Sequence, residues 1–197
     1  MTYLKQLAFI TTLLVGILAS HSSMAATINE DGLHVQPWFI DSFLILKEDV
    51  ADAAADGKRV AVILEQRACP YCKEMHNVNL ADPGISEFIK NNFSVIQMNL
   101  WGAREVEDLD GKIMEERALA RRWRVNFTPT IVFLPTPEEA AKGEVEVARM
   151  PGYFKSFHFL SMFEFVDAGA YVDQNFQRYL QNKFKAMEEK GIKPKVW

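Results

Sequence analysis

Residues 60–76 read VAVILEQRACPYCKEMH, and this stretch decides the fold. Its first part, Val60–Leu64, is apolar and rich in β-branched residues, which predicts a short buried strand. The only two cysteines of the chain follow as Cys69 and Cys72, with Pro70 between them. Because proline is tolerated in the first turn of a helix, we expect a helix to begin at Cys69. The stretch therefore predicts a strand that leads into a helix whose first turn carries a Cys-x-x-Cys pair.

Two thiols at the start of a helix have a specific chemistry. The attacking species in thiol–disulfide exchange is the thiolate, and a free thiol with a pKa of about 8.5 is mostly protonated at neutral pH. Free N–H groups and the helix dipole stabilise an anion at a helix N-terminus by about 0.3–1 kcal/mol, and by up to ~2 when it is partly buried. We therefore expect Cys69, exposed at the helix end, to attack a partner disulfide. Cys72, shielded one turn further in, would then resolve the mixed disulfide.

Two other uses of the cysteine pair stay open at this point. Cys69, Cys72 and His76 could be three ligands of a metal, but a structural zinc site takes four ligands and the chain has no second cysteine pair. The pair could also be a static disulfide, although so small a loop would add little stability. We expect no metal and no other cofactor.

The N-terminus predicts export. Lys5 is followed by a nearly uninterrupted apolar run, Leu7 to Ala19, and Ser23-Met24-Ala25 has the small-x-small pattern of a cleavage site. We expect residues 1–25 to be a signal peptide cleaved near Ala25, residues 26–197 to form one domain, and the mature protein to reside in the periplasm. An uncleaved N-terminal anchor is the alternative. Two cysteines committed to one local motif in an oxidising compartment suit a redox catalyst.

Composition limits the partners. The formal net charge of −4 at pH 7 argues against binding to nucleic acid or to an anionic membrane surface. The sequence has only these two cysteines, so it does not predict a framework of structural disulfides. We expect a monomer that acts on protein partners.

The rest of the chain alternates helix and strand signals. In chain order we expect a helix over 43–55 ended by Gly57, the strand Val60–Leu64, the cysteine helix, a helix over 85–90, a strand over 93–99, a polar insertion over 101–112, a helix from Met114 to Arg124, a buried strand over 130–134, an edge strand over 145–149 and two C-terminal helices. Strands separated by helices early and an antiparallel pair late indicate an α/β sheet with helices on both faces.

The strand, the Cys-Pro-Tyr-Cys helix and the later element Phe127-Thr128-Pro129-Thr130 together resemble the thioredoxin-fold oxidoreductases. The resemblance spans roughly residues 38 to 181. It implies a thioredoxin-like fold with a mixed central sheet, helices on both faces, an N-terminal helical extension and extra C-terminal helices. It also implies that the Thr128–Pro129 bond is cis and that Pro129 faces the cysteine pair. Pro70, Tyr71 and Thr128 would contact the substrate.

Three segments are most similar to the periplasmic thioredoxin-related proteins found with bacterial sulfur-oxidation systems. They are residues 65–76, residues 119–125, and Gly152-Tyr153 with the following residues 157–160. This likeness implies a reductant of protein disulfides that receives electrons from a membrane thiol transporter. A thiol oxidase or isomerase of the same fold, and a client-binding module with a regulatory disulfide, remain alternatives.

The sequence departs from thioredoxins at the proton acceptor of the second cysteine. Thioredoxins place a buried Asp six residues before the first cysteine, and Ile63 stands there instead. Glu65, two residues on and therefore on the same strand face, is the candidate substitute. It could equally be a solvated carboxylate at the strand end. His76 could relay a proton or simply pack in the helix, and Arg67 could help to hold the thiolate or remain solvated.

Overall fold

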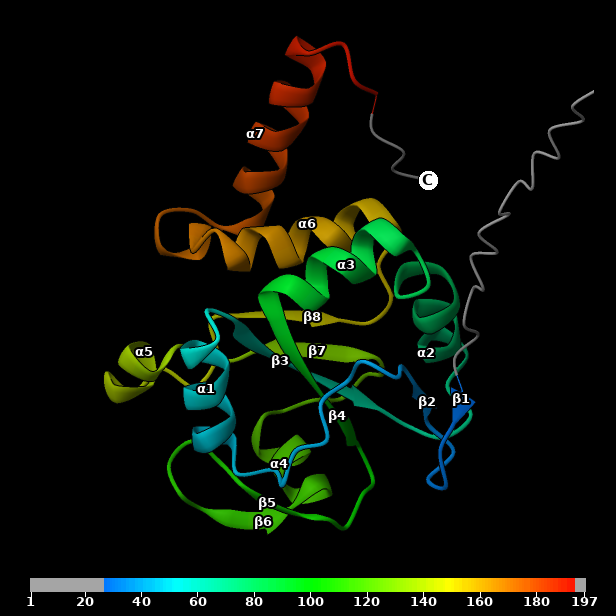
Figure 1. Ribbon diagram of the computed structural model, residues 1–197, viewed down its shortest axis with the longest axis vertical. Coiled ribbons are helices and arrows are strands. Elements are labelled where there is room, and N and C mark those ends of the chain that lie inside the picture. The colour runs from blue at the N-terminus through cyan, green and yellow to red at the C-terminus, as the bar shows by residue number, and fades with distance from the viewer. Residues whose placement is uncertain (1–26, 194–197) are drawn as a thin grey trace, which may run out of the picture.

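In the computed structural model, which describes residues 27–193, a four-stranded mixed sheet forms the centre of the molecule (Figure 1). Its strand order is β4-β3-β7-β8, with β3 at Arg59–Glu65, β4 at Phe93–Asn99, β7 at Thr130–Phe133 and β8 at Ala148–Pro151. Strand β3 pairs with β4 in parallel and with β7 in antiparallel orientation, and β7 pairs with β8 in antiparallel orientation. The mixed sheet of the expected α/β fold is therefore confirmed.

Helices cover both faces of this sheet, because alternate side chains of β3 enter two different cores. Val60, Val62 and Leu64 pack in one core, with α1 (Leu46–Ala55) and α4 (Glu116–Arg122). Ala61 and Ile63 face the other core, which lies beneath α3 (Pro83–Asn92) and α6 (Ser156–Asp167). Two further segments, η2 (Ala170–Val172) and α7 (Phe176–Glu189), follow α6, so the extra C-terminal helices are present.

The helix that follows β3 changes character after its first turn. It begins as α2 (Pro70–Glu74) and continues as the π-helical segment η1 (Met75–Asn79), in which the N–H of Leu80 donates to the carbonyl of Met75. The expected helix at the cysteine pair is thus confirmed, and the π-helical turn is a feature that the apolar pattern did not predict. Such single turns are rare and occur mostly at functional sites.

Several boundaries differ from expectation. Met114 lies in the strand β6 (Ile113–Glu115) and not in a helix. Strand β6 follows the insertion directly and pairs with β5 (Glu105–Glu107) inside it, and Gly111, at φ +79°, lies in the turn between the two strands. The edge strand predicted over 145–149 is instead β8, because pairing with the short strand β7 sets its length and Val145 remains exposed. The short helix α5 (Pro137–Ala141) lies between β7 and β8, where none was expected.

Residues 27–45 precede α1 and run beside β4, an edge strand of the central sheet, where the N–H of Ile40 donates to the carbonyl of Val95. This segment contains a small antiparallel ribbon of β1 (Thr27–Ile28) and β2 (His34–Val35), which the sequence did not predict. The predicted signal peptide, residues 1–25, lies outside the described residues. Among residues 27–193, no helix has the length and apolarity required to cross a bilayer.

Candidate functional site

Cys69 and Cys72 are joined by a disulfide at the start of α2. Cys69 is the N-cap residue, and its Sγ accepts a hydrogen bond of 3.0 Å from the backbone N–H of Cys72. Pro70, the first helical residue, has no N–H of its own. When the disulfide is reduced, the same N–H and the helix dipole are positioned to stabilise a thiolate on Cys69. The geometry therefore separates the roles of the two sulfurs.

The turn from β3 into α2 places Cys69 by means of an unusual backbone conformation. Ala68 has φ +57°, in the left-handed region, which costs an L-residue with a Cβ about 1–2 kcal/mol. This turn directs the chain from the strand end into the helix, so that Cys69 becomes the N-cap. Backbone strain of this kind is commonly found at functional sites.

Thr128 lies against Cys69, and the Thr128–Pro129 peptide bond is cis, as expected. The Thr128 hydroxyl donates to Cys69 Sγ at 3.4 Å, and the Thr128 carbonyl oxygen lies 3.6 Å from the same sulfur. Cys69 is only 4% exposed in this disulfide form, compared with 1% for Cys72. The prediction of an exposed Cys69 is therefore wrong for the oxidised protein, because the disulfide and Thr128 cover its sulfur.

A groove of about 640 Å³ lies beside this contact. Its wall is formed by residues from four places: the end of β3, the first turn of α2, the loop before β7 and the end of β8. They are Gln66, Tyr71, Asn126, Phe127, Thr128, Pro151, Gly152 and Tyr153. Tyr71 and Phe127 are strongly exposed, at 62% and 66%. Tyr71 stacks on Tyr153 with ring centroids 6.3 Å apart. The groove thus presents aromatic surface next to the sulfur that is expected to react.

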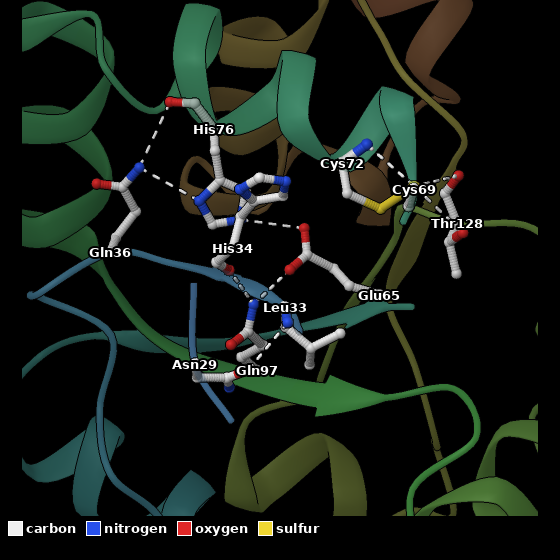
Figure 2. Close-up of polar contacts among 10 residues, drawn as sticks. All are labelled: Asn29, Leu33, His34, Gln36, Glu65, Cys69, Cys72, His76, Gln97 and Thr128. Carbon is white, nitrogen blue, oxygen red and sulfur yellow. Dashed lines mark hydrogen bonds and ion pairs between the residues drawn. A yellow bond between two sulfur atoms is a disulfide. The ribbon is translucent and has the colours of Figure 1, made fainter. Parts of the chain in front are cut away.

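The opposite side of the site is a sealed polar cluster, drawn in Figure 2. Glu65 and His76 have no exposed surface, and His76 Nε2 lies 3.0 Å from Glu65 Oε1. The second carboxylate oxygen, Oε2, accepts a short hydrogen bond from the side-chain amide of Gln97 on β4. In Figure 2 the Glu65 carboxylate points from β3 toward the helical segment that carries both Cys72 and His76. The alternative of a solvated Glu65 is therefore excluded.

The N-terminal segment completes this cluster. The side-chain amide of Gln36 lies 3.3 Å from His76 Nδ1 and 3.4 Å from the His76 carbonyl oxygen. The amide of Gln97 also donates to the backbone carbonyl of His34, at 2.5 Å. Gln36 and Gln97 both line a cavity of about 230 Å³ between the N-terminal segment and the sheet. The two amides thus stand between the buried Glu65–His76 pair and that cavity.

Comparison with known proteins identifies the family to which this arrangement belongs. The family model described as a thioredoxin-like domain matches residues 46–167, which include the cysteine pair, the Thr-Pro loop and all four strands of the central sheet. The chain belongs to the thioredoxin-like family. Together with the Cys69–Cys72 disulfide at the helix start, this membership makes the protein a thiol–disulfide oxidoreductase.

Solved structures of several such proteins are similar to this thioredoxin-like chain. A thioredoxin-fold protein from Helicobacter pylori shares 26% identity and a TM-score of 0.53, over 66% of this chain and 82% of that one. A thioredoxin from Thermus thermophilus shares 31% identity and a TM-score of 0.45, over 62% and 83%. The oxidised C-terminal domain of DsbD from Neisseria meningitidis shares 16% identity and a TM-score of 0.44, over 64% and 96%. A comparison with curated proteins gave no match.

The structure of this thioredoxin-like protein brings the predicted site residues together on two sides of the disulfide. Tyr71 and Thr128 line the groove, and Glu65 lies in the sealed cluster. Pro70 and Pro129 do not line the groove, but each is the chain neighbour of a residue that does. Arg67 is turned away from the sulfurs, since its Nε donates to the carbonyl of Asp31 at 3.2 Å. The alternative of a metal site would use Cys69, Cys72 and His76 as ligands. In the structure the two sulfurs form a disulfide, and His76 is hydrogen-bonded to Glu65.

Sequence reasoning missed Gln36 and Gln97 altogether. Neither residue belongs to a recognisable motif, and each is an ordinary polar residue in its local sequence. A faint signal existed at Gln97, since a polar side chain in the middle of an apolar strand requires a hydrogen-bond partner when it is covered. Gln36 had no comparable signal, because the N-terminal segment has no helix or strand pattern.

Proposed function

We propose that this thioredoxin-like oxidoreductase reduces disulfide bonds in client proteins. Cys69 acts as the nucleophile and Cys72 as the resolving thiol. The observation that carries the proposal is the buried Glu65 carboxylate, which accepts N–H groups of His76 and Gln97. A carboxylate with two such donors can take the proton of Cys72 while a client is reduced and return it in the reverse step. The direction itself depends on the reduction potential of the cysteine pair, and the likeness to the proteins of sulfur-oxidation systems supports reduction.

The reaction balances as a transfer of two electrons and two protons. The Cys69 thiolate attacks the client disulfide, a mixed disulfide forms, and the first client sulfur leaves as a thiolate that takes a proton from water. Cys72 then gives its proton to Glu65 and attacks Cys69 Sγ. The second client sulfur leaves as a thiolate and takes a proton from water, while Glu65 releases the proton of Cys72 to water. The protein ends with the Cys69–Cys72 disulfide that the structure contains, and the client ends with two thiols.

The groove is the proposed client site. An extended client segment would lie along Thr128 and Tyr71, with apolar side chains against the aromatic wall. Pro129 supports the choice of this side, because it has no backbone N–H that could donate to the sulfur of Cys69 in place of a client group.

The cellular setting is also part of the proposal. Residues 1–25 would direct export, and the protein would act in the periplasm as a monomer. There it would receive electrons from a membrane thiol transporter and serve a process related to sulfur oxidation. This setting rests on the sequence of the N-terminus and on the likeness described above. Cell fractionation, together with the in vivo redox state of Cys69 and Cys72, tests it, and a cytosolic protein or a permanently oxidised pair would contradict it.

The decisive experiment measures catalysis and direction together. The protein should accelerate the reduction of insulin by dithiothreitol, and its cysteine pair should equilibrate with glutathione at a potential near that of thioredoxin, about −270 mV. Replacement of both cysteines by alanine should abolish the acceleration, whereas a pure binding module would keep its cellular role after this change. A potential near −120 mV, with faster oxidation than reduction of clients, would identify an oxidase instead.

A further inference from the structure

Glu65 and His76 present an unusual arrangement for a buried acid. Two ionisable side chains without exposed surface lie 3.0 Å apart, one on β3 and the other in the π-helical segment η1. Removing ionisable groups from water is costly unless their polar atoms find partners. Here both carboxylate oxygens and both ring nitrogens have one. A network so fully satisfied has a defined proton arrangement.

Gln36 determines that arrangement. Its amide nitrogen lies within hydrogen-bond distance of both His76 Nδ1 and the His76 carbonyl oxygen, and the carbonyl can only accept. The amide therefore donates to Nδ1 as well, which leaves the ring proton on Nε2. The Nε2–H then points at Glu65 Oε1. A neutral His76 in the Nε2–H tautomer and an ionised Glu65 satisfy every one of these contacts.

We infer that His76 is a positioning residue for disulfide reduction: its Nε2–H keeps Glu65 in the carboxylate form that accepts the proton of Cys72, and Gln36 of the N-terminal segment keeps His76 in that tautomer. The inference rests on the proposed function and deepens it. It makes residues 27–45, which lie outside the matched family region, a working part of the redox site. His76 acts through Glu65 and does not itself touch the reacting sulfurs.

The other titratable groups around the pair do not supply the same effect. His34 on β2 has its ring centroid 5.8 Å from that of His76. Burial is the largest cause and lowers the pKa of His34, Glu65 raises it, and Lys73 on α2 lowers it. The net direction is downward, so His34 is neutral at pH 7. The remaining ring neighbour of His76, Phe39, carries no charge. The donor on Glu65 Oε1 is thus His76 itself.

The test is the pH profile of a single turnover. The pre-reduced protein is mixed with insulin between pH 5 and 9, and the loss of its thiols is followed by acid quenching and mass spectrometry. His76→Leu should slow the reaction about tenfold at pH 7. It should also move the acidic limb of the profile to higher pH, because a buried Glu65 with one donor fewer binds a proton more readily. The rate should recover at high pH.

Two further variants separate this role from a merely structural one. His76→Gln should restore the profile, since the Nε2–H of glutamine reaches the position of the imidazole Nε2–H. Gln36→Leu should shift the profile in the same direction as His76→Leu, but less. His158→Gln on α6 is the matched control and should leave the profile unchanged. If His76→Leu does not fold, a shifted pH profile in Gln36→Leu together with an unshifted profile in His76→Gln still supports the positioning role.

A uniform rate loss at every pH in the His76 and Gln36 variants, with no displacement of the profile, would overturn the inference. A second readout does not depend on turnover. Nitrogen-15 NMR of the reduced protein should show His76 as the neutral Nε2–H tautomer, and Gln36→Leu should give a mixture of tautomers. An imidazolium or an Nδ1–H tautomer in the unsubstituted protein would contradict the inference even if insulin is reduced. Failure to reduce insulin with the Nε2–H tautomer present would instead remove the proposed function and with it the role of His76 in reduction, while the tautomer that Gln36 selects would stand.

Discussion

The two sides of the Cys69–Cys72 disulfide differ in every physical respect. On the groove side, aromatic rings such as Tyr71 and Phe127 are exposed, and the space is open to solvent. On the other side, Glu65 and His76 are fully buried, and their polar atoms are satisfied by amides. The groove side can accommodate different client segments, whereas the buried side keeps Glu65 and His76 in one fixed hydrogen-bonding arrangement.

This difference assigns a separate task to each sulfur. Cys69 contacts Thr128 at the edge of the groove, where a client disulfide can approach. Cys72 is the more deeply buried sulfur and is carried by the helical segment that also contains His76. A nucleophile that is held as a thiolate at a helix N-terminus does not need an internal base, whereas a buried thiol that must lose its proton does. The asymmetry of the site therefore follows the order of the two chemical steps.

The largest effect is expected when the negative charge of Glu65 on the sealed side is removed. Glu65→Gln keeps the size of the side chain but removes its proton affinity, so we expect client reduction at pH 7 to slow about 100-fold. The thermal unfolding midpoint should change little by comparison. Quenched insulin-reduction assays measure the rate. The control is Glu74→Gln, which removes an exposed carboxylate on α2. Unchanged rates between pH 6 and 8 would reduce Glu65 to a structural residue.

Alkylation of the reduced protein compares the two sulfurs directly. Cys69 should react with iodoacetamide at neutral pH about tenfold faster than Cys72, because only Cys69 has the N-cap position that favours a thiolate. Peptide mass spectrometry after short exposure gives both rates, and the unfolded protein, where both thiols are solvated, is the control. Preferential labelling of Cys72 would reverse the assigned roles. A companion variant, Cys72→Ser, should accumulate mixed disulfides through Cys69, which non-reducing gels detect.

Substitutions in the groove should change the affinity for the client, measured as KM, and leave the rate of the chemical steps, measured as kcat, unchanged. Phe127→Ala removes an exposed aromatic side chain of the wall, and a loss of about 1 kcal/mol in client binding corresponds to a roughly fivefold higher KM. The value of kcat should stay the same, because the sulfurs and Glu65 are untouched. Val145→Ala, another exposed apolar residue outside the groove, serves as the control. A fall in kcat with constant KM would place Phe127 in the wrong role.

The smallest expected effect concerns the turn at which the two sides meet. Ala68→Gly relieves the left-handed conformation at φ +57°, and we expect a gain of at most about 1 kcal/mol in the free energy of unfolding. Chemical denaturation measures the gain, and the reduction rate should remain within about twofold. A loss of stability would mean that the Cβ of Ala68 makes contacts worth more than the strain.

The groove side could be predicted from the sequence, and the sealed side only in part. The Cys-x-x-Cys pair stands out as a short motif between an apolar strand and a helix, so local pattern was enough to place Cys69 and Cys72. Thr128–Pro129 was placed beside them by the resemblance to thioredoxin-fold oxidoreductases. Glu65 could be proposed because strand periodicity puts it on the same face as Ile63. The strands β3 and β4 followed from runs of apolar residues, as expected for a sheet covered on both faces.

What could not be predicted depends on contacts between distant residues. Gln36 meets His76 across forty positions of the chain, and Gln97 meets Glu65 across 32. Their identity as partners follows from the packing of the N-terminal segment and of β4, which no local pattern encodes. The shift of the edge strand to β8 has the same origin, since its register is set by pairing with β7.

The π-helical turn η1 has a consequence for how this chain is compared with others. Its hydrogen bond from Leu80 to Met75 spans five residues, one more than the repeat of an α-helix. A relative whose cysteine helix is α-helical throughout therefore has one residue fewer between Glu74 and Leu80 for the same two ends. An ungapped alignment anchored on the cysteine pair would then be out of register by one position from Leu80 onward. Residues of α3 and β4 can be matched with such a relative only when a one-residue insertion is allowed within η1.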